Sequence, residues 1–168
     1  MKEIVTDRYI LKLLNDEYLN DVYEVLSNPK VIENLNMSIH KDIDDTKKLF
    51  NSYYEGYRNK EKYPFVIVDK NNQFIGVFLI KLDLYDEDSY EFTIYLKESM
   101  WGCGIYSEIL PYMIDFTFKN IGVSNFRGFV MDKNNTSKRV LEKSGFKLEK
   151  IFDVEGLEGK IYSYLITK

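Results

Sequence analysis

Cysteine, histidine, tryptophan and proline are scarce in this sequence: its 168 residues include one cysteine, one histidine, one tryptophan and three prolines. One cysteine cannot form an internal disulfide, so we expect a fold held by packing in a reducing, cytoplasmic compartment. The single histidine, His40, has no cysteine or second histidine near it in the sequence, which argues against a metal site. We therefore expect no metal, and His40 is interpreted as a surface residue rather than one at a substrate mouth.

Long apolar runs and an excess of positive charge are also missing. No run approaches the roughly 18 residues that a membrane-spanning helix needs, and Met1–Asp7 lacks the apolar segment of a signal peptide. The formal net charge of -4 argues against non-specific binding of nucleic acid and suits a cationic amine, although many ordinary proteins are equally acidic. The expected partners thus include neither a membrane nor a nucleic acid.

The chain is rich in aromatic and alternating apolar sequence, with 14 tyrosines and 11 phenylalanines. It is long enough to bury a core without metals or disulfides, and no linker or repeat divides it, so residues 1–168 are predicted to form a single domain. The patterns predict an α+β fold, mixed α/β, with a mostly antiparallel central sheet of about seven strands flanked by helices on both faces. Strands are expected at 9–14, 64–69, 73–80, 90–96, 126–131, 146–153 and 160–167. Helices are expected at 19–26, ended by Asn28-Pro29, after a cap at Asp42 or Asp44, and around 109–118 and 137–144.

The stretch Met100–Leu110 stands out because two glycines, Gly102 and Gly104, join a predicted strand to the start of a predicted helix. Such a turn lets backbone N–H groups converge at the positive end of the helix dipole, which favours an anion, above all phosphate. The stretch lacks the Lys-Ser or Lys-Thr of a P-loop and the third glycine of a dinucleotide fingerprint. Taken alone, Gly-x-Gly is also typical of an ordinary turn, so both interpretations remain open here.

A second block, Asn134–Phe146, makes the pattern more specific. It reads Asn-Asn-Thr-Ser-Lys-Arg-Val-Leu-Glu-Lys-Ser-Gly-Phe. Together with Trp101-Gly102-Cys103-Gly104 it resembles the GNAT acetyltransferase superfamily, close to the RimJ/RimL-type N-acetyltransferases. The likeness extends from about Thr6 to the C-terminus. It implies a GNAT fold in which two strands splay apart to admit the cofactor, and acetyl-CoA as co-substrate.

The resemblance implies a set of cofactor-binding residues. The N–H groups of Gly102 to Ser107 would bind the pyrophosphate, and Gly104 would let the backbone approach it closely. The pantetheine arm would add to a strand edge by β-type hydrogen bonds, where spacing alone favours an ordinary buried strand. Trp101 would lie within reach of the ligand, and Asn134 would hold the pantetheine or its own loop. The full set is Ile94, Tyr95, Leu96, Trp101, Gly102, Cys103, Gly104, Ile105, Tyr106, Ser107, Asn134 and Ser137.

Two residues are candidates for the chemistry that the resemblance implies. Glu91 lies where related enzymes place a carboxylate, so it is the candidate general base, acting through water; the alternative is a surface strand glutamate. The tyrosine acid of other GNAT enzymes would fall at Leu141, which cannot donate a proton. Ser137 matches the serine of the RimJ/RimL pattern and would protonate the leaving sulfur instead, the alternative being an N-cap of its helix.

Some residues depart from the pattern or stand apart from it. Tyr106 occupies a position that is usually glycine or alanine, so its ring must point away from the cofactor or lie against it. Pro111 predicts a kink or a delayed helix start, or else a proline tolerated near the first turn. Cys103 is interpreted as a solvent-facing side chain rather than an acidified thiol. The acidic run from Asp83 to Asp88 would attract a cationic substrate or be only a solvated loop.

The sequence therefore predicts an acetyl-CoA-dependent N-acetyltransferase that uses direct transfer in a ternary complex. The expected acceptor is a protein N-terminal α-amine. The alternatives are a small polyamine-like amine, suggested by Glu91-Phe92-Thr93-Ile94 and Lys133-Asn134, and a non-catalytic acyl-CoA-binding sensor, suggested by Tyr106 and Leu141. The protein is expected to be a monomer or a homodimer.

Overall fold

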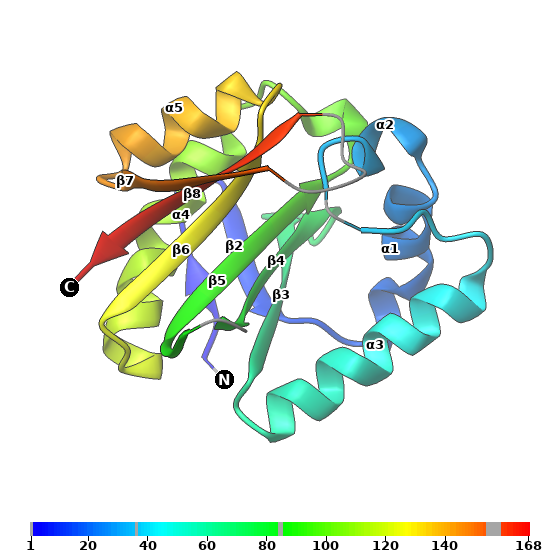
Figure 1. Ribbon diagram of the computed structural model, residues 1–168. Helices are drawn as coiled ribbons and strands as arrows, with labels where there is room; N and C mark the ends of the chain where they lie inside the picture. The colour runs from blue at the N-terminus through cyan, green and yellow to red at the C-terminus, as the bar shows by residue number, and fades with distance from the viewer. Residues whose placement is uncertain (1, 36, 84–85, 154–158) are drawn as a thin grey trace. The chain divides into compact units, whose positions relative to one another are not determined.

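The computed structural model describes residues 2–35, 37–83, 86–153 and 159–168, and not the side chain of Glu87. Part of the predicted acidic loop, at 84–85, and most of the predicted hairpin loop at 155–159 lie outside the described residues. The strands, coloured along the chain in Figure 1, are β1 (Ile4–Val5), β2 (Tyr9–Leu13), β3 (Lys62–Asp69), β4 (Phe74–Asp83), β5 (Asp86–Leu96), β6 (Asn125–Met131), β7 (Lys147–Asp153) and β8 (Lys160–Thr167). The helices are α1 (Leu19–Leu26), α2 (Pro29–Ile32), α3 (Ile43–Arg58), α4 (Ile105–Phe116) and α5 (Asn135–Lys143). The short turns η1 (Asp16–Tyr18) and η2 (Glu98–Met100) and the π-helical η3 (Thr117–Ile121) complete the order.

The sheet has eight strands in the order β1-β2-β3-β4-β5-β6-β8-β7. The pairs β1–β2, β2–β3, β3–β4, β6–β8 and β7–β8 are antiparallel, whereas β5 and β6 run parallel. The predicted mixed and mostly antiparallel fold is confirmed. The strand beyond the expected seven is β1, which is only two residues long.

The chain divides into two compact units, each with its own buried core. The first unit comprises residues 1–81 and 94–105. Its core forms because α1 and α3 each present apolar side chains at helical spacing, and α3 packs against β3. Asp42 caps α3, as one of the two predicted alternatives had it, because its carboxylate accepts from the N–H groups of Asp44 and Asp45. The buried cluster includes Val22, Leu26, Phe50, Tyr53, Val66, Val77 and Tyr95.

Asn28-Pro29 follows the end of α1, as predicted, and has a second role that the sequence did not indicate. Helix α1 ends at Leu26, and Pro29 then opens α2, with the Asn28 side chain accepting from the N–H of Lys30 as its N-cap. Proline suits the first helical position because its missing N–H has no intrahelical partner there. Asn28 is extended, as predicted for the residue before proline, and α1 ends ahead of it, so the Asn-Pro pair separates two helices and also begins the second.

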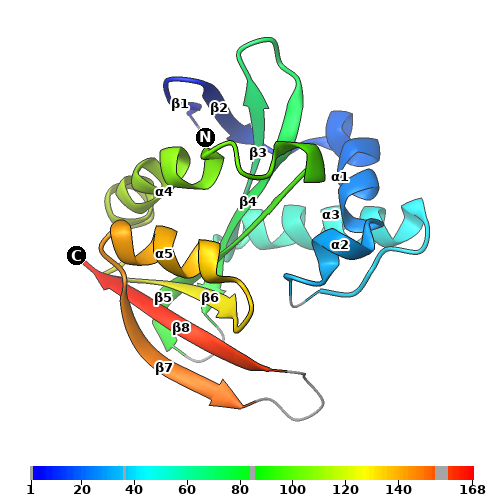
Figure 2. The ribbon, with the colours of Figure 1, turned by 90° about the horizontal axis from the view of Figure 1, so that it is seen from above.

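The second unit comprises residues 82–93 and 106–168. Its core is aromatic: the ring of Phe92 lies 4.9 Å from that of Phe126 and 5.9 Å from that of Phe146, measured between centroids. Gly128 lets this core close, because a Cβ there would lie 3.0 Å from Phe92 and 3.2 Å from Leu141. Helix α5 packs beside β6 and β7 (Figure 2).

Helix α4 carries Pro111 in its interior. The predicted delayed start is wrong, because the helix begins at Ile105, directly after the glycine turn. The predicted apolar face is confirmed: Ile109, Leu110 and Met113 are fully buried. The chain then widens into the π-helical η3, which ends at Gly122 in the left-handed region.

Candidate active site

Strand β5 connects most of the predicted site residues. Phe92 on this strand packs into the aromatic core of the second unit, and Tyr95 into the core of the first. The parallel ladder with β6 runs from Ser89 paired with Asn125 to Phe92 paired with Gly128. The strand continues beyond its last β6-paired residue to Leu96. Ile94, Tyr95 and Leu96 therefore lie past the end of this ladder.

Gly76 brings β4 close to the same end of β5. A Cβ at position 76 would collide with the carbonyl oxygen of Tyr95 and lie 2.9 Å from the Cα of Leu96. The N–H of Lys97 donates to the carbonyl oxygen of Ile75 at 2.9 Å. Strand β4 thus fixes one edge of the segment that leads into the glycine loop.

The glycine loop has the backbone of an anion site. Gly102 and Gly104 both have φ of +74°, a conformation that side chains disfavour. Within the described residues, no hydrogen bond uses the N–H groups of Gly102, Cys103 or Gly104. All three residues are exposed, and a Cβ at Gly102 would meet no atom within 4 Å. The loop ends at the first residue of α4, so it presents N–H donors and a helix N-terminus in one place.

Tyr106 turns away from this loop into the protein. Its ring makes an edge contact with Phe92, with centroids 6.2 Å apart. Burial raises the pKa of its hydroxyl well above the ordinary value. Of the two predicted orientations, the ring takes the inward one, so the tyrosine leaves the N–H face of the loop open.

Trp101 and Cys103 flank the first glycine and both are exposed. The indole Nε1 of Trp101 donates to the carbonyl oxygen of Leu96 at 3.3 Å, which ties the loop back to the end of β5. The Sγ of Cys103 lies 3.7 Å from the carbonyl oxygen of Trp101. Cys103 therefore faces solvent as predicted, and Trp101 covers one backbone acceptor of the predicted pantetheine edge.

Arg8, which the sequence did not single out, reaches this loop from the segment before β2. Its Nη2 donates to the carbonyl oxygen of Cys103 at 3.0 Å. The same nitrogen lies 3.6 Å from where a Cβ of Gly104 would be. The guanidinium also lies over the ring of Tyr9, 5.0 Å from its centroid. A permanent positive charge is thus placed beside the two glycines.

The start of α5 assigns different roles to Asn134 and Ser137. The side-chain oxygen of Asn134 accepts from the N–H of Ser137 at 3.0 Å, so Asn134 is the N-cap. The alternative in which Ser137 caps the helix is therefore wrong. No hydrogen bond of the Ser137 hydroxyl occurs in the described part of the chain, and the residue is half-buried. Leu141 is fully buried in the aromatic core and cannot donate a proton, as predicted.

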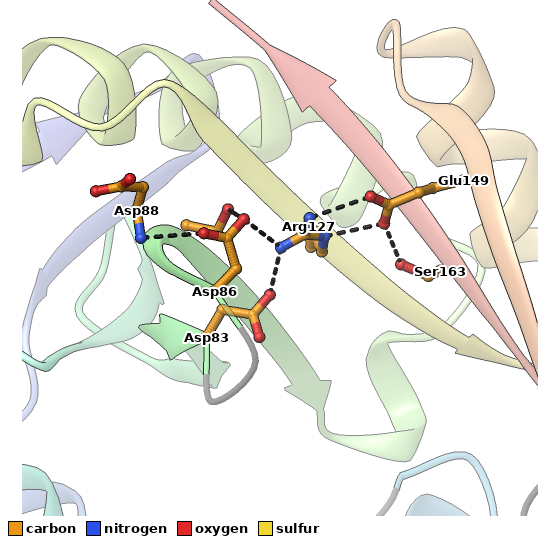
Figure 3. A network of polar contacts seen from close by, with 7 residues as sticks. Asp83, Asp86, Asp88, Arg127, Glu149 and Ser163 are labelled. Carbon is orange, nitrogen blue, oxygen red and sulfur yellow. Dashed lines mark hydrogen bonds and ion pairs between the residues drawn. The ribbon is translucent and has the colours of Figure 1, made fainter.

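Glu91 is half-buried and pairs in register with Arg127 across the β5–β6 ladder. Arg127 is held by three carboxylates from different strands. Nη1 lies 2.7 Å from Oδ2 of Asp83 and 3.2 Å from Oδ2 of Asp86, and the other two nitrogens hold Glu149 at 2.9 and 3.1 Å. Figure 3 shows the guanidinium lying between the two aspartates and Glu149.

This Arg127 network continues through hydroxyl groups. The hydroxyl of Ser89 donates to Oδ2 of Asp86 at 2.6 Å, and that of Ser163 donates to Oε2 of Glu149 at 3.0 Å. The Arg127 hydrogen bond holds the pKa of Glu149 below its ordinary value, and the hydrogen bond from Ser89 does the same for the pKa of Asp86. The side chain of Asp83 is only 1% exposed, so the interpretation of the whole acidic run as a solvated loop is wrong at this residue.

Tyr95 points into the core of the first unit. Its hydroxyl lies 3.4 Å from that of Tyr53 on α3, and both residues are 2% exposed. Burial raises the pKa of Tyr53 to about 12 and raises that of Tyr95 well above its ordinary value. The side chain of Tyr95 thus anchors β5, and only its backbone remains for the predicted pantetheine edge.

His40 contacts a hydroxyl group beside it. The Nδ1 of His40 lies 2.8 Å from the hydroxyl of Thr46, and partial burial lowers its pKa. Among the residues that the structure describes, no group of three or more histidine, cysteine or acidic side chains is arranged to hold a metal ion. Within the same residues, no helix has the length and apolar character needed to cross a membrane.

The candidate residues are distributed over both units. Residues 94–105, with the loop from Trp101 to Ile105, belong to the first unit together with Arg8. Glu91, Tyr106 and Ser107 belong to the second, together with Asn134 and Ser137. Strand β5 and helix α4 are the continuous elements that carry residues of both.

Comparison with known proteins decides the family. Residues 8–147 match the family described as the Acetyltransferase (GNAT) domain. The chain belongs to the GNAT acetyltransferase family. It is a GNAT N-acetyltransferase that uses acetyl-CoA as co-substrate. The matched range covers most of the chain, including the glycine loop and the Asn134 block, so the predicted resemblance is confirmed.

Relatives of this GNAT chain include an uncharacterized N-acetyltransferase, p20, of Bacillus licheniformis, which is 22% identical over all of this chain and 97% of its own length. Among solved structures, ribosomal-protein-S5-alanine acetyltransferase from Vibrio fischeri has a TM-score of 0.85 at 16% identity, covering 99% of this chain and 97% of that one. Spermidine N-acetyltransferase from Vibrio cholerae, in complex with CoA and spermine, has a TM-score of 0.83 at 18% identity and covers 95% of each chain. At these identities the solved structures show the shared fold.

Proposed function

We propose that this GNAT N-acetyltransferase transfers the acetyl group of acetyl-CoA to a protein N-terminal α-amine by direct transfer in a ternary complex, with residues 1–168 acting as one catalytic domain. The observation that carries the CoA site is the glycine loop, whose exposed N–H groups at Gly102 to Gly104 precede the N-terminus of α4. This donor set fits a pyrophosphate, because it offers several N–H groups and the helix dipole to an anion without a side chain in the way. The protein is proposed to be cytoplasmic and a monomer or homodimer.

Acetyl-CoA supplies an activated acetyl group as a thioester. The chain must then bind it and move two protons. The backbone of Ile94, Tyr95 and Leu96 is proposed to pair with the pantetheine amides, with Tyr95 held in place by its contact with Tyr53. The loop from Trp101 to Ser107 is proposed to hold the pyrophosphate, and Asn134 to shape the turn before α5.

Glu91 is proposed as the general base, taking the proton of the ammonium group through a water molecule. It lies on β5, earlier in the strand than the residues that are proposed to bind pantetheine. Ser137 is proposed as the acid that returns a proton to the leaving sulfur. The absence of a hydrogen bond to its hydroxyl within the described residues supports a role other than helix capping.

A small polyamine-like amine is the second candidate acceptor. The likeness to a spermidine acetyltransferase favours it as much as the likeness to a ribosomal-protein acetyltransferase favours a protein N-terminus. The Arg127 network bears on the choice, because Asp83 and Asp86 are already paired with a guanidinium. Part of the acidic run is thereby unavailable to attract a polycation, which supports the N-terminal peptide as the first choice.

The non-catalytic sensor, the third hypothesis from the sequence, is not favoured, because the chain belongs to a family of N-acetyltransferases. One of its two reasons is weakened, since Tyr106 packs against Phe92 instead of blocking the loop. The other reason, Leu141, stands, because a fully buried leucine supplies no acid. The proposal therefore assigns the acid role to Ser137.

The test is a screen of N-terminal peptides and small amines with acetyl-CoA, in which release of free CoA is measured. Peptide turnover with poor turnover of spermidine supports the proposal, and the reverse pattern supports the polyamine alternative. The only tryptophan, Trp101, lies in the loop, so CoA binding is followed separately by its fluorescence, excited at the red edge to avoid tyrosine. Saturable CoA binding without turnover of any amine would favour the sensor.

A further inference from the structure

Strand β7 forms an edge of the sheet beside β8 (Figure 2), and most of it is exposed. It lies last in the strand order, so no described strand pairs with its outer side. Six of its seven residues are exposed. Two of these are large and apolar, Leu148 with 50% and Ile151 with 43% of its surface exposed. Apolar side chains on an unpaired strand edge are typical of a surface that pairs with another strand.

Leu148 and Ile151 lie on the same face of the sheet. Leu148 pairs in register with Tyr164, and Ile151 pairs with Tyr162. Both tyrosines contact side chains of α5: the Tyr164 hydroxyl bonds to a glutamate of this helix, and a lysine of the helix lies over the Tyr162 ring. The two exposed apolar side chains are therefore on the α5 face of the sheet.

The two residues between them lie on the opposite face. Lys150 pairs in register with Ser163, and the Glu149 carboxylate accepts a hydrogen bond from the hydroxyl of the same serine. The register shifts between Leu148 and Lys150, which is how two consecutive residues come to share a face. The side-chain directions are thus symmetric about the point between Glu149 and Lys150, with Leu148 and Ile151 equally far from it.

We infer that β7 is the interface of a homodimer, in which it pairs antiparallel with β7 of a second copy about a two-fold axis between Glu149 and Lys150. Opposed side chains of an antiparallel pair lie on one face, and this axis satisfies that condition. Leu148 then lies opposite Ile151 of the second copy, and the two-fold axis repeats the contact. Lys150 lies opposite Glu149 of the second copy, so opposite charges meet.

The charges on β7 select this pairing. Lysines and a bulge usually protect an edge strand from other chains. Here a shift of one residue in either direction would oppose Glu149 or Lys150 to the same residue of the second copy, and like charges directly opposite are destabilising. Glu149 keeps its bonds to Arg127 and Ser163, because a carboxylate accepts about four hydrogen bonds and the described residues supply three.

The association is measured by analytical ultracentrifugation over a range of protein concentrations. Leu148→Lys is expected to weaken the dimer by at least about tenfold, because it removes two apolar contacts and places two charges in the interface. Val5→Lys is the control, since Val5 is 57% exposed on β1 at the other edge of the sheet. It should leave the dimer unchanged, and circular dichroism checks that both variants are folded.

Cross-linking tests the position of the two-fold axis. In a Cys103→Ser background, chains with Leu148→Cys are mixed with chains with Ile151→Cys and oxidised. Opposed residues of an antiparallel pair have Cα atoms about 4.5–5.5 Å apart, within the range of a disulfide. The mixture should form a disulfide-linked dimer. Either variant alone should not, because identical positions are displaced by three residues, or about 10 Å, along the pair.

Four results would overturn the inference. A wild type that is monomeric at every concentration shows that the edge does not pair. A dimer that Leu148→Lys leaves intact uses another surface. Equal cross-linking by either cysteine variant alone contradicts the two-fold axis. A monomer whose β7 amides become protected from hydrogen exchange by an N-terminal acceptor peptide assigns the edge to the substrate instead of a second copy.

Discussion

The two ends of β5 hold their polar groups in opposite ways. At the start of the strand, Asp86 joins the Arg127 network, in which one guanidinium, three carboxylates and two serine hydroxyls bond to one another. After the end of the strand, the N–H groups of Gly102, Cys103 and Gly104 bond to nothing within the described residues. Both regions are rich in hydrogen-bonding groups. Among the described residues, only the groups of the Arg127 network are bonded to other groups of the chain.

The difference separates stability from ligand binding. Charged groups that are paired with one another are committed to the folded structure, because removing one leaves its partner unpaired at a large cost. N–H groups that no atom of the described chain uses contribute nothing to stability and remain available to a ligand. Glu91 lies on β5 between these two regions. If it is the general base, it belongs with the ligand-binding groups. If it only supports the Arg127 network, it belongs with the stabilising groups.

Glu91→Gln tests which of these two roles Glu91 has, and its expected effect on the reaction rate is the largest of the predicted effects. Loss of a general base lowers the rate by about 10²- to 10⁴-fold. The deficit should be largest at low pH, where more of the acceptor amine is protonated, while the free energy of unfolding stays unchanged. The measurement is CoA release across pH together with urea denaturation, with exposed Glu24→Gln as the control. A wild-type rate with lowered stability would place Glu91 with the Arg127 network instead.

Arg127→Met should destabilise the region at the start of β5, because it removes the guanidinium of the Arg127 network. Asp83, with 1% of its side chain exposed, would lose its ion pair, and breaking a buried pair typically costs about 3–5 kcal/mol. Lys119→Met is the control, since its pair with Asp115 has side chains 70% and 57% exposed and should be worth at most about 0.5 kcal/mol. Urea denaturation measures both. Equal small losses in the two variants would show that the network does not stabilise the second unit.

Gly104→Val should weaken CoA binding at the glycine loop, which follows the end of β5. A β-branched side chain at φ of +74° strains the backbone and projects into the phosphate approach, so CoA affinity should fall at least about tenfold, or 1.4 kcal/mol. Gly122→Val is matched to it, because Gly122 has φ of +88° and open space around its Cβ position, but follows η3. Both variants should lose similar stability, and only Gly104→Val should lose CoA binding in the Trp101 titration. Loss of affinity in both would indicate a general effect of strain.

Acid titration tests the contribution of Glu149 in the Arg127 network, and its expected effect is the smallest. Because Arg127 lowers the pKa of Glu149 in the folded state, this carboxylate contributes stability above its unfolded pKa of about 4.5, and the contribution is lost as pH falls through the lower folded pKa. The difference in unfolding free energy between wild type and Glu149→Gln should therefore shrink as pH falls from about 5.5 to about 3, by about 1 kcal/mol or less. Parallel curves over this window would contradict the assignment.

The sequence predicted the parts of the fold that local patterns determine. The strand and helix positions and the Asp42 cap follow from residues close together in the chain. The extra strand β1 was missed because two residues give no periodicity to detect. The helix end before Asn28-Pro29 was predicted, but α2 was missed because four residues are too few to show a helical periodicity.

The residues that sequence analysis missed act through distant partners. Arg127 lies 44 residues from Asp83 and 22 from Glu149, so its network depends on the strand order and register. Arg8 meets Cys103 across an even longer separation, and the pairing of Tyr53 with Tyr95 depends on where α3 packs. The inward direction of Tyr106 was left open because the position of Phe92 beside it is a property of the folded second unit.

Gly76 and Gly102 should differ in how they tolerate change during evolution. Any side chain at position 76 would collide with the backbone of Tyr95 and Leu96, so selection should keep glycine there whatever acceptor a lineage adopts. Gly102 has open space and only a left-handed backbone to satisfy, which asparagine and aspartate also tolerate. Asparagine can therefore replace Gly102 in the loop during evolution, but it cannot replace Gly76 in the strand. Substrate preference can diversify while the strand edge beside Gly76 stays the same.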